Sequence, residues 1–173
     1  MEMKEPMEGL HFVGKKDDLI KSKRSFRTLE GRDILLVYHQ GILYALDYHC
    51  YHSGGPLENG DIEEIGGNLC IICPKHKYKI SLLHGEGLYK ATDHTAKVPT
   101  RKWFSKGVKQ RVHTVMETNG DVYVKLSVHP GYVDSDFYQG EKGKLEREKA
   151  LAAEAANKAK NIASLVIADS ESD

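Results

Sequence analysis

Two short segments of this chain each carry one cysteine and one histidine, and they restrict its fold more than any other feature. One residue separates Cys50 from His52, and two residues separate Cys73 from His76. Placed side by side, the segments supply two thiolates and two neutral imidazoles. This set of donors suits either a tetrahedral zinc ion or a two-iron cluster with the cysteines on one iron and the histidines on the other.

The pairing of unlike ligands favours the two-iron cluster. Structural zinc sites usually space their ligands Cys-x₂₋₄-Cys with a later His-x₃₋₅-His, so that each loop gives two like ligands. Here each segment gives one sulfur and one imidazole, which lets both sulfurs face one iron while both imidazoles reach the other. Gly54, Gly55 and Pro56 suit a loop wrapped tightly over a cluster, and Pro74 stiffens the second segment. A zinc-stabilised binding module with the same four ligands and no redox activity is the alternative.

The residues around both segments resemble the Rieske [2Fe–2S] ferredoxin family, and within it the small animal Rieske iron–sulfur domain-containing proteins. The similarity extends from about Phe12 to Tyr138 and includes a first loop at residues 50–57 and a second loop at residues 73–80. Further similar segments are Gly-Glu-Gly-Leu-Tyr at 85–89, Ser-Lys-Gly-Val-Lys-Gln-Arg-Val-His-Thr-Val at 105–115 and Asp-Ser-Asp-Phe-Tyr at 134–138.

This resemblance implies that Cys50, His52, Cys73 and His76 bind one Rieske-type [2Fe–2S] cluster per chain. It also implies a soluble ferredoxin that takes single electrons from a flavin reductase and passes them to an acceptor such as an oxygenase. An oxygenase itself is not expected, because its mononuclear iron needs two histidines and a carboxylate in a further catalytic domain. No histidine follows Tyr138. We therefore expect an electron carrier and not an enzyme.

The resemblance further predicts a low reduction potential, roughly −150 to −50 mV. In members of the respiratory cytochrome bc complexes each loop holds an additional cysteine, and these two form a disulfide; Gly55 and Lys75 stand at those positions here. The Ser and Tyr hydroxyls that hydrogen-bond cluster sulfur in those proteins are replaced by Tyr78 and Ile80. Hydrogen bonds to sulfur stabilise the reduced state, so their loss lowers the potential. Whether the Tyr78 hydroxyl reaches a sulfide through another rotamer is left open.

Short apolar runs between glycine-containing turns predict an all-β fold. A Gln-Gly turn joins the runs at 33–38 and 42–46, and an Asn-Gly turn joins those at 108–117 and 121–128. Further strands are expected at 11–14, 25–29, 69–72 and 78–82, with a helical turn at 15–21. Short, regularly spaced strands indicate an antiparallel sandwich or barrel. The resemblance adds a small cluster-binding subdomain inserted between strands of this base.

The chain is expected to form one domain with a tail at each end. Residues 1–9 form a polar tail without an apolar leader, residues 10–138 form the Rieske domain, and residues 139–173 form an Ala- and charge-rich helical or disordered tail. A narrow apolar stripe along the last segment indicates either a lightly packed, solvated helix or a partner-binding helix. The stripe comprises Leu145, Ala152, Ala155, Ala159, Ile162 and Val166.

The charge balance and the cysteine count restrict the surroundings of the protein. With 25 basic and 25 acidic residues, no net field favours nucleic acid or a membrane surface. No run of 18 apolar residues is present. If Cys50 and Cys73 bind metal, Cys70 stays unpaired, which suits a reducing compartment better than secretion. We expect a cytoplasmic monomer.

Several other residues near the two loops have simpler interpretations. His49 has the wrong spacing for a ligand, and Cys70 is expected to be a small buried apolar residue. The lysines Lys75, Lys77 and Lys79 either steer an acidic redox partner or form a solvated surface. Trp103 is expected to pack in the core or against a loop.

Overall fold

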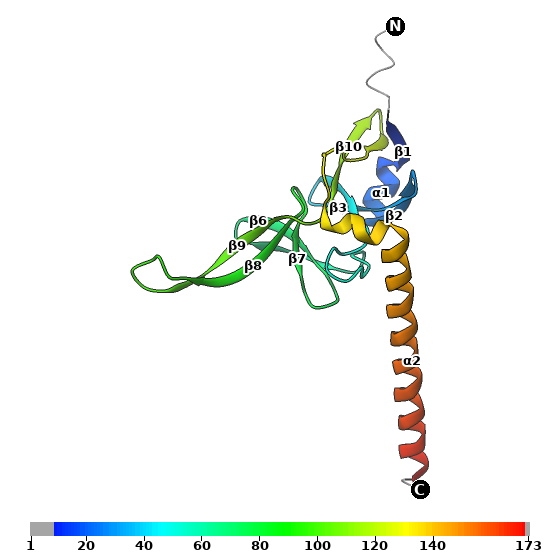
Figure 1. Ribbon diagram of the computed structural model, residues 1–173. Helices are drawn as coiled ribbons and strands as arrows, with labels where there is room; N and C mark the ends of the chain where they lie inside the picture. Colours follow the sequence, from blue (N-terminus) through cyan, green and yellow to red (C-terminus); the bar gives the residue numbers. More distant parts are fainter. Residues whose placement is uncertain (1–8, 172–173) are drawn as a thin grey trace.

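The computed structural model describes residues 9–171 as two antiparallel sheets with a long C-terminal helix (Figure 1). The six-stranded sheet has the order β1 (Leu10–Lys15), β11 (Asp121–Lys125), β10 (Val112–Thr118), β4 (Ile42–Asp47), β3 (Arg32–His39), β2 (Arg24–Leu29). The five-stranded sheet has the order β5 (Asp61–Ile65), β6 (Asn68–Ile72), β7 (Lys79–Ser81), β8 (Glu86–Asp93), β9 (Thr100–Val108). The helices are α1 (Lys16–Ser22), the 3₁₀ helix η2 (Asp134–Gln139) and α2 (Glu141–Glu171).

The five-stranded sheet is formed entirely by the segment between β4 and β10, so it is an insertion in the six-stranded base. The base curves so that its two edge strands approach each other, and the Arg27 side chain on β2 donates to the Val13 carbonyl on β1 at 2.9 Å. The predicted all-β fold, with an antiparallel barrel-like base, an inserted subdomain and a C-terminal helix, is confirmed.

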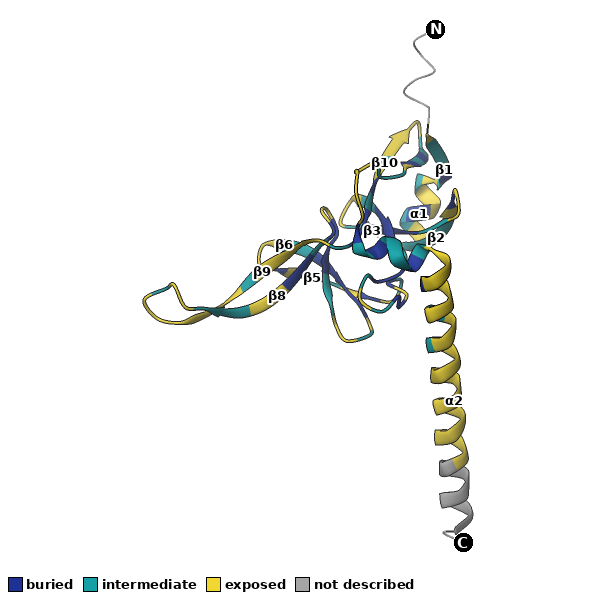
Figure 2. Cartoon of the chain, viewed as in Figure 1, coloured by how far each residue is buried: buried dark blue, intermediate teal, exposed yellow. Residues whose placement is uncertain are grey.

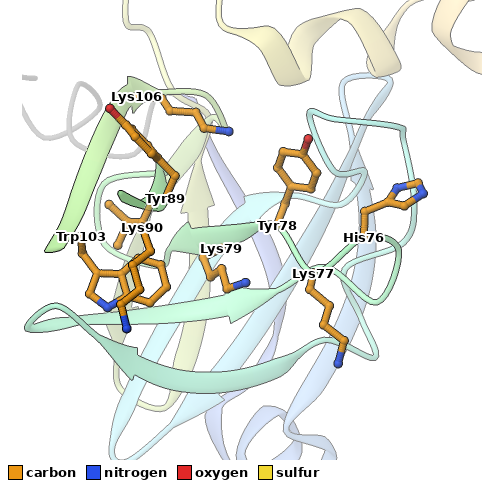
Figure 3. Close-up of a pocket in the computed structure, with 9 residues that line it drawn as sticks. His76, Lys77, Tyr78, Lys79, Tyr89, Lys90, Trp103 and Lys106 are labelled. Atoms are coloured by element: carbon orange, nitrogen blue, oxygen red, sulfur yellow. The ribbon is translucent and has the colours of Figure 1, made fainter. Parts of the chain in front are cut away.

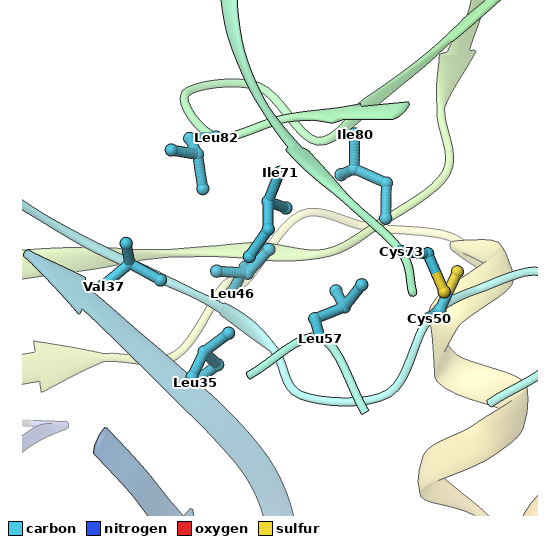
Figure 4. Packing of buried hydrophobic residues seen from close by; sticks show 9 residues of the cluster. All are labelled: Leu35, Val37, Leu46, Cys50, Leu57, Ile71, Cys73, Ile80 and Leu82. Atoms are coloured by element: carbon cyan, nitrogen blue, oxygen red, sulfur yellow. The ribbon is translucent and has the colours of Figure 1, made fainter. Parts of the chain in front are cut away.

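Strand β3 connects two hydrophobic cores. Side chains alternate between the two faces of a strand, and Ile34 and Leu36 pack inside the base while Leu35 and Val37 face the inserted sheet. All four are at most 1% exposed. The core between the sheets also contains both cysteines of the loops, which lie at its edge (Figure 4). Cys50 and Cys73 are therefore fixed by the same packing that joins the sheets.

The structure differs from the sequence-based expectation in several strands. The strand expected at 108–117 is interrupted, because β9 ends at Val108 and β10 begins at Val112, with Gln110 and Arg111 buried between them. The strand expected at 121–128 ends at Lys125. Strands β5, β8 and β9 were not predicted. Figure 1 shows the β8–β9 hairpin projecting from the body, and only one residue of β9 is even partly buried, so it lacks the apolar alternation that identifies a strand.

Helix α2 extends away from the sheets, and Figure 2 shows that most of its described side chains are exposed. Leu145 and Ile162 of the expected apolar stripe are 53% and 62% exposed. The side chain of Val166 lies outside the described residues, as do residues 1–8 of the expected N-terminal tail and residues 172–173. Within the described part of the chain, no helix combines the length and apolar character needed to cross a membrane.

Candidate metal centre

The first loop and the second loop have the same backbone hydrogen bonds at their cysteines. The Cys50 N–H donates to the carbonyl five residues later at 2.8 Å, and the Cys50 carbonyl accepts from the N–H four residues later at 2.7 Å. Cys73 makes the same two bonds at 2.8 and 3.1 Å. The two cysteines therefore hold equivalent positions in two similar turns, and the histidine follows as the second residue in one turn and the third in the other.

The two cysteine side chains are fully buried and meet between the loops (Figure 4). Contact with Cys73, followed by burial, raises the pKa of the Cys50 thiol, whereas the hydrogen bond with Cys50 lowers the pKa of Cys73 to about 7. Backbone N–H groups also point at the sulfurs, those of His52 and Ser53 at Cys50 and that of Lys75 at Cys73. These amides favour the negatively charged thiolates that a metal ion requires.

The two histidine side chains lie together on the exposed side of the loops. The ring centroids of His52 and His76 are 5.2 Å apart, with the rings nearly perpendicular at 84°. The Tyr78 ring stacks on His52 at 3.8 Å. Partial burial, then the neighbouring His76 and Lys106, lower the pKa of His52, which favours the neutral imidazole that binds metal.

The structure thus brings the four predicted ligands together as one cysteine pair and one histidine pair. Within residues 9–171, no three His, Cys, Asp or Glu side chains converge as they would on one metal ion. A Rieske cluster needs two protein donors on each of two irons, and the donor pairs with their amide-lined sulfurs fit that group.

A buried side chain, Gln110, holds the start of the first loop. Its amide nitrogen donates to the carbonyls of Asp47 at 2.9 Å and His49 at 2.8 Å, and its carbonyl accepts the Tyr51 N–H at 3.0 Å. Gln110 is fully buried. One side chain from the segment before β10 therefore satisfies three backbone groups on both sides of Cys50.

Next to Gln110, the buried carboxylate of Asp47 joins three side chains from distant segments. It accepts from Arg32 at 2.7 Å and Ser135 at 2.6 Å, and its other oxygen pairs with the His113 ring at 2.9 Å. A second carboxylate, Asp136, extends this network: burial acts to raise its pKa, but hydrogen bonds from Arg111, the Val133 amide and Arg32 hold that pKa at about 2.

Sequence reasoning did not predict this polar network. The available signal was the similarity at 105–115 and 134–138, because Gln110, Arg111 and His113 belong to the first of these segments and Ser135 and Asp136 to the second. The network fixes β10 and η2 against the strand that leads into the first loop.

Helix η2 and the start of α2 press on the outer side of the first loop. The Tyr138 hydroxyl donates to the His52 carbonyl at 3.2 Å, and Arg147 donates to the Tyr138 carbonyl at 3.2 Å. Gly54 has φ +74°, and a Cβ there would lie 2.5 Å from the Tyr138 ring. Glycine is therefore required at 54 both for its backbone angle and for space.

The positions linked to a low potential also lie as the resemblance implies. A Cβ on Gly55 would be 3.1 Å from Cδ of Lys75, so the two positions face each other and carry no cysteine. Ile80 is fully buried in the core. Cys70 is buried in an apolar cluster with Ile65, as predicted for it. The His49 ring pairs with Asp33 at 3.0 Å.

Comparison with known proteins assigns the chain to a family. The sequence pattern described as soluble Rieske-type ferredoxin matches residues 11–129, which is more than half of the chain. This protein belongs to the soluble Rieske-type ferredoxin family. A human Rieske domain-containing protein is 51% identical over 126 residues, covering 73% of this chain and 80% of the human protein. Ferredoxins of this family carry electrons and do not transform substrates themselves.

Two solved structures share the Rieske ferredoxin fold at low sequence identity. The ferredoxin of carbazole 1,9a-dioxygenase from Nocardioides aromaticivorans IC177 has a TM-score of 0.51 at 18% identity, covering 69% of this chain and 100% of that chain. Pseudomonas putida CBB5 NdmB has a TM-score of 0.50 at 19% identity, covering 71% of this chain and 37% of that chain. These similarities concern the fold.

Proposed function

We propose that this Rieske-type ferredoxin binds one [2Fe–2S] cluster and carries single electrons between two redox proteins. Cys50 and Cys73 would hold one iron, and His52 and His76 the other. The observation that carries the proposal is the arrangement of two buried sulfurs behind two exposed imidazoles, on loops with the same backbone hydrogen bonds. When bound, such a cluster accepts and releases one electron.

The protein residues set the conditions for that electron transfer. The buried cysteines keep water from the sulfur side, and the amides of His52, Ser53 and Lys75 stabilise thiolate charge there. The exposed imidazoles form the edge through which a partner makes contact. This division favours an electron carrier over a zinc-stabilised binding module, which would place all four ligands around one ion.

We further propose that the reduction potential is low. Gly55 and Lys75 face each other without a disulfide, and Ile80 offers no hydroxyl to sulfur. A low potential suits a flavin reductase as donor and an oxygenase-type protein as acceptor; the fold similarity to the ferredoxin of carbazole 1,9a-dioxygenase is in keeping with an acceptor of that type. Cys70, the cysteine not assigned to the cluster, forms no disulfide, which suits a reducing compartment such as the cytoplasm.

Chemical analysis and EPR of the dithionite-reduced protein test this function. We expect two irons and two sulfides per chain, a red-brown oxidised protein and an EPR signal that appears on reduction. Cys50→Ser and Cys73→Ser should abolish cluster assembly, while Cys70→Ser should keep the visible spectrum because Cys70 lies in a separate apolar cluster. A colourless protein with one zinc and no sulfide would establish the binding-module alternative instead. A folded but colourless Cys70→Ser variant would show that the ligand assignment is wrong.

A further inference from the structure

A groove of about 330 Å³ lies beside the second loop, between His76 and the β8–β9 hairpin (Figure 3). Four lysines line it: Lys77, Lys79, Lys90 and Lys106. No acidic side chain of the described residues joins them in that lining. The groove is therefore a concentrated positive surface on a chain whose total charge is zero.

The four lysines are not neutralised by partners within the described part of the chain. In that part of the chain, the lysines that form ion pairs are Lys15, Lys16, Lys75, Lys102 and Lys109. None of these lines the groove. Of the lysines Lys75, Lys77 and Lys79, for which partner steering and a solvated surface were both left open, Lys75 pairs with Glu154 on α2 at 2.7 Å. Lys77 and Lys79 remain beside His76, and the β8–β9 hairpin, which sequence reasoning did not predict, adds Lys90 and Lys106.

Aromatic rings hold two of these lysines in place. The Lys106 nitrogen lies 4.8 Å from the centre of the Tyr78 ring and 5.9 Å from that of Tyr89, and the Lys90 nitrogen lies 5.6 Å from the Trp103 ring. Such cation–π contacts restrict a flexible lysine without neutralising it. The groove thus presents ordered positive charges beside the aromatic rings of Tyr78, Tyr89 and Trp103, and aromatic side chains are enriched in protein interfaces.

Tyr78 connects this groove to the candidate metal centre. Tyr78 lines the groove, and its ring stacks on the His52 ring. The His52 ring in turn contacts the His76 ring edge to face. A protein that occupies the groove therefore lies directly against the histidine pair.

We propose that this groove is the docking site for a carboxylate-rich surface of the redox partner, with Lys79, Lys90 and Lys106 contacting its acidic side chains. The inference rests on the proposed function, since it assigns the contact surface of the same electron carrier. The charge of the groove determines the occupant: unpaired lysines attract and orient an acidic surface and repel a basic one.

Trp103, the only tryptophan of the chain, lines the groove and reports on its occupancy. We would titrate the full-length protein with a synthetic hexaglutamate peptide and follow Trp103 fluorescence. The expected result is saturable binding that weakens as salt rises, because screening reduces attraction between exposed charges. The double variant Lys90→Glu/Lys106→Glu should bind the peptide at least about tenfold more weakly.

The matched control reverses two exposed lysines on α2, Lys144 and Lys149. Lys144→Glu/Lys149→Glu has the same total charge as the groove variant and should bind hexaglutamate within about twofold of the wild type. Equal weakening in both double variants would mean that only total charge matters and would overturn the proposal. Unchanged binding in the groove variant, or no saturable binding by the wild type, would also overturn it.

Electron transfer to small oxidants gives a second measurement. Oxidation of the dithionite-reduced protein by the hexacyanoferrate(III) anion should slow several-fold in the groove variant, while oxidation by the hexaamminecobalt(III) cation should accelerate. An unchanged ratio of the two rates would contradict docking at the groove. Iron and sulfide analysis of the same samples separates the two proposals. Absence of iron and sulfide would overturn the proposed function. The peptide titrations would still decide whether the groove selects acidic surfaces.

Discussion

The two loops have the same backbone hydrogen bonds but are supported differently. The first loop is held from outside by the side chains of Gln110 and Tyr138, which lie far from it in sequence. The second loop bends through His76 and Lys77, which have φ of +62° and +57°, and its side-chain ion pair is Lys75 with Glu154 on the exposed α2. Left-handed backbone at residues other than glycine is strained and is frequent at functional sites.

The first loop is therefore shaped by tertiary contacts and the second by its own backbone. The supported first loop should respond strongly to changes at distant residues. The second loop, which borders the basic groove, should respond mainly to changes in surface charge.

Gln110→Ala should have the largest effect. It leaves the Tyr51 N–H and the carbonyls of Asp47 and His49 without their partner, which should lower the unfolding free energy by roughly 4 kcal/mol. It should also reduce the iron retained per folded chain. Gln139→Ala is the matched control, because Gln139 bonds the Asp33 backbone instead. That variant should lose stability but keep its iron content. Equal iron loss in both variants would contradict the special support of the first loop.

Gly54→Ala should have the next largest effect. It should lower the unfolding free energy by about 3 kcal/mol, because the left-handed backbone is strained for alanine and the new Cβ collides with Tyr138. Gly67→Ala provides the control, since Gly67 has φ +84° and no atom within 4 Å of a Cβ there. It should lose only about 1 kcal/mol, because strain acts without a clash. Urea denaturation of both variants measures the difference. Equal losses of unfolding free energy in Gly54→Ala and Gly67→Ala would show that η2 does not pack tightly against the first loop.

A smaller effect is expected at Asp136, whose pKa is held at about 2. A carboxylate with a lowered folded-state pKa contributes stability above its unfolded value near 4, and this contribution disappears as the pH falls toward 2. Asp136→Asn should therefore cost roughly 1 to 2 kcal/mol at pH 7, with allowance for solvent screening. In denaturation experiments, the difference in unfolding free energy between wild type and Asp136→Asn should narrow as the pH falls from 4 to 2. A gap that is constant with pH would contradict the charged network.

The sequence predicted the parts of the fold that depend on neighbouring residues. The hairpin of β3 and β4 and the loops with Cys50 and Cys73 follow from local turns and spacing. The polar network does not, because the partners of Asp47 lie up to 88 residues away and polar residues carry no periodic signal for burial. The β8–β9 hairpin was not predicted either, because the exposed residues of β9 show no alternation of apolar and polar side chains.

The orientation of Tyr78 also depended on tertiary structure. Its ring stacks on His52 at 3.8 Å, an arrangement that no local pattern indicates. Sequence reasoning therefore left open whether its hydroxyl bonds to cluster sulfur. The stacked ring makes a packing role the simpler interpretation.

The smallest effect is expected for Tyr78→Phe, which keeps the stacked ring and removes only the hydroxyl. Its midpoint potential should agree with that of the wild type within about 30 mV, where 59 mV is tenfold in equilibrium constant for a one-electron couple. Tyr78→Leu, which removes the ring, is the comparison and should shift the potential further. A fall of more than about 60 mV in Tyr78→Phe would show that the hydroxyl does hydrogen-bond sulfur.

In the proposed cluster one iron is held by His52 and His76, which lie on differently supported loops. Electron–nuclear double resonance of the reduced protein, labelled with ¹⁵N in its histidines, tests this claim most directly. We expect two strongly coupled ¹⁵N nuclei among the nine histidines of the chain. Reduced protein without strong ¹⁵N coupling would contradict it, because the cluster would then have no histidine ligand.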